Sequence, residues 1–197
     1  MSEACKLSNA ALWAAEPYMK AGVSTKEIDH VIHKFIVQAG AKPSFLGYAG
    51  FPASACISLN DQVIHGIPSS RVILKEGDVV SVDVGAYYNG FHGDNAYTFR
   101  VGEVTQEADQ LLRVTEESLM KGIQQAKAGN RIGDISNAIQ TYTESFGYGV
   151  VREYIGHGVG RELHEDPEVP NFGKPGRGMR LVPGMTIAVE PMINLSG

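Results

Sequence analysis

The sequence predicts an α+β fold of two similar halves, each with two helices followed by strands that form a mainly antiparallel sheet. First, helical spacing and strand-like alternation occur in separate runs, which is typical of the α+β class. Second, the stretch from Lys20 to Gly40 recurs from Lys127 to Gly147 with six of 21 positions identical. Third, Asn89-Gly90 joins two alternating segments in the manner of a β-hairpin.

The first half spans about residues 1–102. Its second helix has apolar residues at helical spacing, a Ser24–Glu27 pair typical of a capping box, and Gly40 as a C-terminal cap. The strands are predicted from apolar and polar alternation. The expected elements are helices at about 5–20 and 24–39 and strands at about 54–59, 78–87 and 91–101.

The second half, about residues 103–197, repeats this order, and the two halves together are expected to form a single catalytic domain. In the same alignment of the two halves, which matches Lys20 with Lys127, Asp83 aligns with Glu190, so one carboxylate position is duplicated. No strand follows Glu190 as one follows Asp83, and residue 1 falls inside the first helix, so we expect a fragment truncated at both ends or a naturally short form. The expected elements are helices at about 105–127 and 133–146 and strands at about 148–155 and 185–193.

Composition excludes several classes of protein. Hydrophobic residues make up 43% of the 197 residues and charged residues 20%, which is typical of a globular chain rather than a disordered one. The net charge of −5 has no basic cluster, so we expect no direct contact with nucleic acid. No apolar run is long enough for a signal peptide or membrane span, and two cysteines fit a reducing compartment. These features predict a cytoplasmic protein that binds no membrane.

The hairpin places two carboxylates on one face. With a two-residue loop at Asn89-Gly90, Asp94 pairs with Gly85 and lies diagonal to Asp83, and side chains alternate faces along a strand. Two such carboxylates repel each other and are costly to desolvate without a cation. The alternatives are a hairpin at a solvated sheet edge, or a register shifted by one residue.

Further candidate ligands follow in the second half. His157 is flanked by glycines, His164 follows seven residues later, and Glu190 lies in an apolar segment; His65 follows the strand at about 54–59. Each also has a plain structural interpretation, as a core histidine, a loop histidine or a solvated strand residue. Three carboxylates and one imidazole suit Mn²⁺, Fe²⁺, Co²⁺ or Zn²⁺. Two ions sharing Asp94 would activate a water, which predicts hydrolytic chemistry.

Four motifs carry a resemblance to a known family over nearly the whole chain. They are GYAGFPASACISLNDQVIHGIP, GDVVSVDVGAYYNGFHGDNAYTF, GHGVGRELHEDPEVP and PGMTIAVEPM. The chain resembles the type I methionine aminopeptidases of peptidase family M24, which have the pita-bread fold. The resemblance implies that the metal ligands are Asp83, Asp94, His157 and Glu190, with Asp94 bridging two divalent cations. It further implies that His65 and His164 contact the substrate, His164 near the scissile amide, and that Tyr48, Phe51 and Cys56 line a methionine pocket; the alternative for these three is core packing.

The resemblance implies removal of the initiator methionine from nascent polypeptides whose second residue is small, by a monomer that meets its substrates near the ribosome. It also implies a fifth ligand, a glutamate on a strand after Glu190, which the 197 residues do not contain, so activity of the chain as written is in question. The alternatives are a non-catalytic or impaired pita-bread module that binds peptides or proteins, and an enzyme similar to aminopeptidase P or prolidase.

Overall fold

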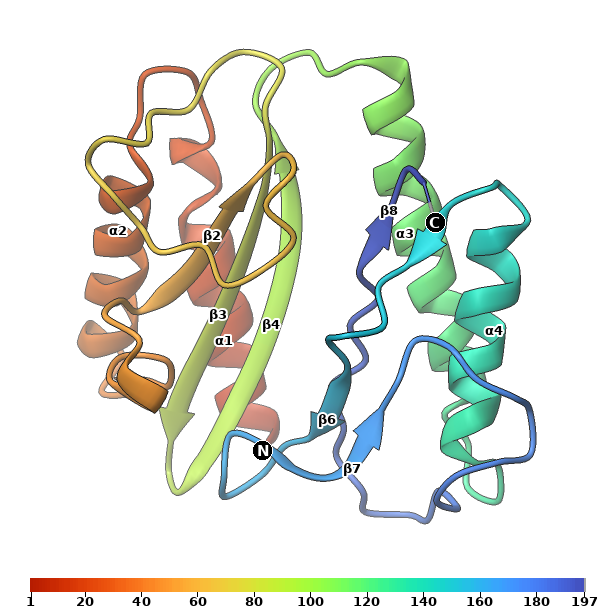
Figure 1. The fold of residues 1–197 in the computed structure, drawn as a ribbon. Helices are drawn as coiled ribbons and strands as arrows, with labels where there is room; N and C mark the ends of the chain where they lie inside the picture. The colour runs from red at the N-terminus through yellow and green to blue at the C-terminus, as the bar shows by residue number, and fades with distance from the viewer. Residues whose placement is uncertain (197) are drawn as a thin grey trace. The chain divides into compact units, whose positions relative to one another are not determined.

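The computed structural model describes residues 1–196 and divides into two compact units (Figure 1). Unit 1 comprises Met1–Thr105 together with Gly160–Leu163, and unit 2 comprises the remainder of the chain. Each unit is described by itself. No helix among the described residues is long and apolar enough to cross a membrane.

Unit 1 is a four-stranded antiparallel sheet with two α-helices on one face. Strand β3 is central: β4 pairs with it along one edge, and β1 and β2 pair with it along the other. The elements are α1 (Ser2–Ala14), η1 (Glu16–Tyr18), α2 (Thr25–Gln38), β1 (Lys42–Pro43), η2 (Tyr48–Gly50), β2 (Ala55–Leu59), β3 (Val79–Tyr88) and β4 (Phe91–Arg100).

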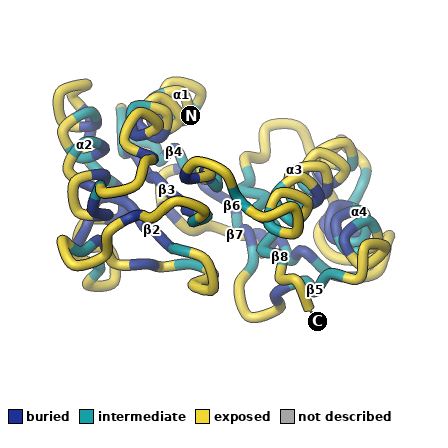
Figure 2. Tube along the Cα trace, turned by 90° about the horizontal axis from the view of Figure 1, so that it is seen from above, coloured by how far each residue is buried: buried dark blue, intermediate teal, exposed yellow. Residues whose placement is uncertain are grey.

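The core of unit 1 lies between the helices and the valine face of β3. Val80, Val82 and Val84 are fully buried and contact the apolar sides of α1 and α2. In Figure 2 the buried positions follow β3 and the inner side of α2, while the outer side of α2 is exposed. The helix predicted at 5–20 ends earlier than expected: α1 stops at Ala14, and the short η1 turn, which begins at Glu16, contains Pro17, which has no N–H.

Two local predictions are confirmed in unit 1. The Ser24 side chain accepts from the Glu27 N–H, and the Glu27 carboxylate accepts from the Ser24 N–H, which completes the capping box. Asn89 and Gly90 have φ values of 51° and 84°, as a type I′ turn requires, and the ladder pairs Gly85 with Asp94. The hairpin register is therefore the predicted one.

Unit 2 contains two long helices and short strand pairs. Helices α3 and α4 pack against each other, β5 pairs with β8, and β6 pairs with β7. A small core joins Ile135 and Ile139 of α4 to Val169 and Leu181. The elements are α3 (Gln106–Gln125), α4 (Ile132–Glu144), β5 (Gly149–Val150), β6 (Gly156–Gly158), β7 (Glu165–Val169) and β8 (Ile193–Asn194).

The strand predictions for unit 2 are mostly wrong. The segment 148–155 contains only β5, and the segment 185–193 contains only the start of β8, so Glu190 lies outside any regular strand. The chain near Glu190 runs beside β6, but its contacts are intermittent: Ile187 bridges Gly158, and the Ala188 N–H donates to the His157 carbonyl at 2.7 Å. The segment therefore lacks the continuous ladder that defines a strand.

Candidate active site

The two hairpin carboxylates lie on the face of the unit 1 sheet opposite the core. Asp83 of β3 pairs with Cys56 of β2, and Asp94 pairs with Gly85. On the same face, Ser81 and Thr98 share a hydrogen bond of 2.7 Å. Asp83 is on an inner strand and Asp94 on the edge strand β4, and both are only partly exposed. The hairpin therefore lies at a sheet edge, as the alternative supposed, but neither carboxylate is fully exposed.

The combined charge of these carboxylates acts on the neighbouring thiol. The pKa of Cys56 is raised to about 12, first by burial and then by the negative charges of Asp83 and Asp94. The negative charges of both carboxylates thus act on the Cys56 thiol in a poorly solvated region. Such a region favours a bound cation, because a cation offsets the repulsion between the carboxylates.

An apolar cluster adjoins the carboxylates within unit 1. Cys56 is buried with Phe45 and Leu163, and Phe51 packs against them. Gly85 makes this packing possible, because a Cβ there would lie 2.7 Å from the Phe45 ring. The structure thus brings together two of the three predicted pocket residues.

The third predicted pocket residue, Tyr48, lies in η2 and is 46% exposed. Two cluster members were missed: Phe45 and Leu163. Phe45 lies two residues before the first quoted motif, so that motif does not include it. Leu163 lies in the third quoted motif, but no local signal places it beside residues so far away in the chain.

His65 occupies a conformation that its neighbour enforces. Its φ is 58°, in the left-handed region that non-glycine residues rarely adopt, and its side chain is exposed. Gly66 is clamped onto β2: the Ile57 N–H donates to the Gly66 carbonyl, and the Gly66 N–H donates to the Ser58 hydroxyl, both at 2.9 Å. The backbone beside His65 is therefore fixed although the side chain faces solvent.

In unit 2, His157 and Glu190 form a close donor pair. The His157 Nδ1 lies 2.8 Å from the Gly158 carbonyl, which can only accept, so Nδ1 carries the hydrogen and a neutral ring presents its Nε2 lone pair. That Nε2 lies 3.4 Å from the Glu190 Oε1. The His164 ring lies beside the His157 ring, with 4.1 Å between the ring centroids.

This pair fits the coordination of a divalent metal. Nitrogen and oxygen ligands bind such an ion at about 2.0–2.2 Å, so two ligands of one ion are roughly 3.0–3.5 Å apart. The 3.4 Å separation of Nε2 and Oε1 lies in this range. Among the described residues of either unit, no three His, Cys, Asp or Glu side chains form a metal cage, so each unit offers a pair of donors.

A residue that the sequence analysis missed holds the backbone of Glu190. Asn171 is fully buried, and its Nδ2 donates to the Glu190 carbonyl at 2.9 Å. Because the chain near Glu190 lacks a continuous ladder, this amide supplies a hydrogen bond that a neighbouring strand would otherwise supply. An asparagine following a strand is also typical of loops, so the sequence carries no distinctive signal for it.

A model of metallopeptidase family M24 matches residues 1–197. The chain belongs to this family. It is 54% identical over 195 residues to "Methionine aminopeptidase" of Clostridium acetobutylicum, and the aligned region covers 99% of this chain and 78% of the relative. It is 55% identical over 177 residues to "Methionine aminopeptidase 1" of Bacillus subtilis, covering 90% and 71%. The crystal structure of methionine aminopeptidase from Thermotoga maritima superposes with a TM-score of 0.96 at 45% identity, covering 98% and 78%.

These relationships confirm four predictions for this M24 peptidase. The resemblance to type I methionine aminopeptidases is confirmed, and so is the pita-bread fold. The chain is a hydrolase that removes the initiator methionine, and it depends on a divalent metal. The non-catalytic and prolidase-like alternatives are not favoured.

Proposed function

We propose that this M24 peptidase holds two divalent metal ions with Asp83, Asp94, His157 and Glu190, Asp94 bridging, and removes methionine from nascent chains whose second residue is small. The observation that carries the proposal is the His157–Glu190 pair, with Nε2 and Oε1 separated by 3.4 Å and the ring tautomer set by Gly158. The shared face of Asp83 and Asp94 supports it independently.

The donor set limits which metals are suitable. Carboxylates with one imidazole and no thiolate ligand suit Mn²⁺, Fe²⁺, Co²⁺ or Zn²⁺. When bound, such ions supply a water of lowered pKa and a Lewis acid for the scissile carbonyl. We assign to His164 a hydrogen bond to the oxyanion that develops on the substrate, and to His65 a contact with the bound peptide.

Phe51, Cys56 and Tyr48 are proposed to bind the methionine side chain. A flexible thioether suits an apolar slot of limited size. Cys56 fits such a slot because it is buried, and a buried free thiol behaves as a small apolar side chain. The packing of Cys56 with Phe45 and Phe51 supports the assignment.

We further propose that the enzyme is a cytoplasmic monomer that acts on peptide N-termini near the ribosome and constitutes a single catalytic domain. Free thiols at Cys5 and Cys56 are compatible with a reducing compartment. Gel filtration and co-sedimentation with ribosomes test the oligomeric state and the ribosomal contact.

The ligand assignment is tested by titrating metal-free protein with Mn²⁺ or Co²⁺ in a calorimeter and by following methionine release from a Met-Gly peptide and a Met-Leu peptide. We expect metal binding, with release from Met-Gly only. Glu190→Gln and His157→Ala should weaken metal binding by about 10–100-fold or more. The control is Glu168→Gln, which alters an exposed carboxylate on β7. Unchanged metal affinity in both ligand variants would refute the assignment.

A further inference from the structure

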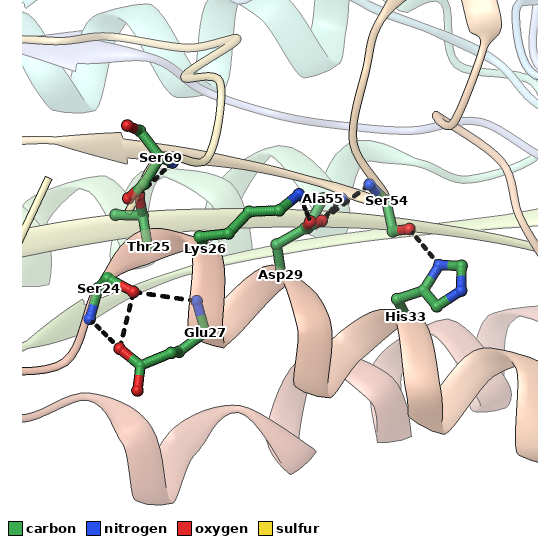
Figure 3. A network of polar contacts seen from close by, with 9 residues as sticks. All are labelled: Ser24, Thr25, Lys26, Glu27, Asp29, His33, Ser54, Ala55 and Ser69. Atoms are coloured by element: carbon green, nitrogen blue, oxygen red, sulfur yellow. Dashed lines mark hydrogen bonds and ion pairs between the residues drawn. The ribbon is translucent and has the colours of Figure 1, made fainter. Parts of the chain in front are cut away.

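Helix α2 carries two stripes of residues spaced four apart, which places each stripe on one side of the helix. The apolar stripe is Ile28, Ile32 and Ile36, all fully buried in the core of unit 1. The polar stripe is Thr25, Asp29 and His33 (Figure 3). The apolar stripe packs the helix against the sheet, and the polar stripe lies on a different side of the helix, where it can form hydrogen bonds with other segments of unit 1.

Asp29 anchors the start of β2. Its side chain is almost wholly buried, and its Oδ1 accepts the N–H groups of Ser54 at 2.8 Å and Ala55 at 3.2 Å. Its Oδ2 accepts from the Lys26 ammonium at 2.8 Å. Hydrogen bonds to a charged acceptor are stronger than neutral ones, and here the two buried N–H groups depend on one carboxylate.

The other two stripe residues hold the same strand end and a second loop. His33 Nδ1 shares a hydrogen bond of 2.8 Å with the Ser54 hydroxyl. The Thr25 hydroxyl donates to the Ser69 carbonyl at 3.1 Å and accepts from the Ser69 N–H at 2.9 Å. Figure 3 shows these contacts leaving one side of the helix.

The segments held in this way lead directly to the proposed substrate residues. Ala55 precedes Cys56, and Ser54 follows Phe51 by three residues; Ser69 follows His65 by four. A surface hollow of about 250 Å³, lined by Leu46, Pro52 and two of the stripe residues, Asp29 and His33, lies beside the first loop. The polar contacts of Asp29 and His33 therefore hold this loop together with the packing of Phe51.

We propose that Thr25, Asp29 and His33 are positioning residues for substrate binding, with Asp29 and His33 setting the methionine pocket and Thr25 setting the His65 loop. The inference rests on the proposed function of Phe51, Cys56 and His65. None of the three stripe residues is assigned a contact with substrate or metal. Their effect is on how well the pocket is formed before the peptide arrives.

The test compares Asp29→Ala, which removes the acceptor, with Asp29→Asn, which retains one oxygen. Asp29→Ala should raise KM for a Met-Gly peptide about tenfold with kcat nearly unchanged, since lost uniform binding appears in KM. It should weaken binding of free methionine, measured by calorimetry, by a similar factor, and accelerate amide exchange at Ser54 and Ala55. Asp29→Asn should recover part of each loss.

Two further comparisons separate positioning from general stability. Thr25→Val should raise KM for the peptide, and Thr25→Ser, which keeps the hydroxyl, should restore it. The matched control is Glu27→Ala, which removes a carboxylate from the same helical turn. The Glu27 carboxylate caps the helix and holds neither loop. It should lower thermal stability and leave KM unchanged.

The outcomes distinguish this inference from the proposed function. If the unaltered protein neither binds nor releases methionine, the proposed function fails and the inference fails with it. If the unaltered protein is active and Asp29→Ala exchanges faster at residues 54 and 55 while KM and methionine affinity stay within twofold, the stripe is merely structural and the inference alone is overturned. Should Asp29→Ala not fold, His33→Leu, which removes only the bond to Ser54, gives the same decision.

Discussion

Replacing Gly66 by alanine places a methyl group where the backbone of β2 already lies. The new Cβ would lie 2.0 Å from the Ile57 carbonyl oxygen and 2.9 Å from the Ser58 Cα. Both neighbours are strand backbone, which cannot rotate aside as a side chain does. The loop that carries His65 must therefore separate from β2.

The cost follows from the contacts that this separation breaks. Gly66 exchanges two hydrogen bonds of 2.9 Å with β2, one to the Ile57 N–H and one to the Ser58 hydroxyl. Each bond contributes about 0.5–1.5 kcal/mol net, and a buried donor left unsatisfied costs about 1–3 kcal/mol. We expect Gly66→Ala to lower the free energy of unfolding by about 2–4 kcal/mol and to abolish most peptide hydrolysis, because His65 moves with the loop.

Urea unfolding followed by circular dichroism measures the stability, and methionine release measures the activity. Gly40→Ala is the matched control: Gly40 has a φ of 76° and open space around its Cα, so this variant incurs only the conformational cost, about 1 kcal/mol. The reasoning is refuted if Gly66→Ala is as stable as Gly40→Ala and retains activity.

Three other predictions follow from buried or charged groups. Asn171→Leu leaves the Glu190 carbonyl without its buried donor, so it should lower stability by about 1–3 kcal/mol and weaken metal binding in a calorimetric titration; unaltered affinity would contradict it. In metal-free protein, Cys56, whose pKa is raised to about 12 by burial and then by Asp83 and Asp94, should react slowly with iodoacetamide at pH 9. Asp83→Asn, also free of metal, should lower that pKa and speed the reaction seen by mass spectrometry, and an equal rate would count against this electrostatic cause. The pKa of Glu27 is lowered because the N-cap serine donates its hydroxyl and backbone N–H, so its stabilising effect is present above its ordinary pKa of 4.5 and lost as pH falls through the lowered value. The stability difference between the unaltered protein and Glu27→Ala should therefore shrink in acid, and a difference independent of pH would argue otherwise.

Features that depend on neighbouring residues were predicted from the sequence. The capping box needs only Ser24 and Glu27, and the hairpin register needs only the turn at Asn89-Gly90 and the alternation around it. Because the register followed, the shared face of Asp83 and Asp94 was predicted as well. These interactions span few residues, so local chemistry determines them.

Features that depend on distant pairing were not predictable in the same way. The segment around Glu190 has the alternation of a strand, yet its pairing with β6 is intermittent. Strand β7, whose sequence EDPEV lacks an apolar alternation, forms because β6 is available to pair with it. The support of Glu190 by Asn171 joins residues 19 positions apart through a side chain, which no periodic pattern records.

The short segment Gly160–Leu163 determines how the chain can be divided. It belongs to unit 1, where Leu163 completes the Phe45–Cys56 cluster and the Gly160 carbonyl accepts from the His92 N–H, although both of its flanks belong to unit 2. A single cut after Thr105 therefore yields a first fragment that lacks part of its own interior. The two halves are similar in sequence, but they cannot be separated into self-sufficient modules by splitting the gene at one point. Any scheme for complementation from fragments or for circular permutation must supply these four residues to the first half.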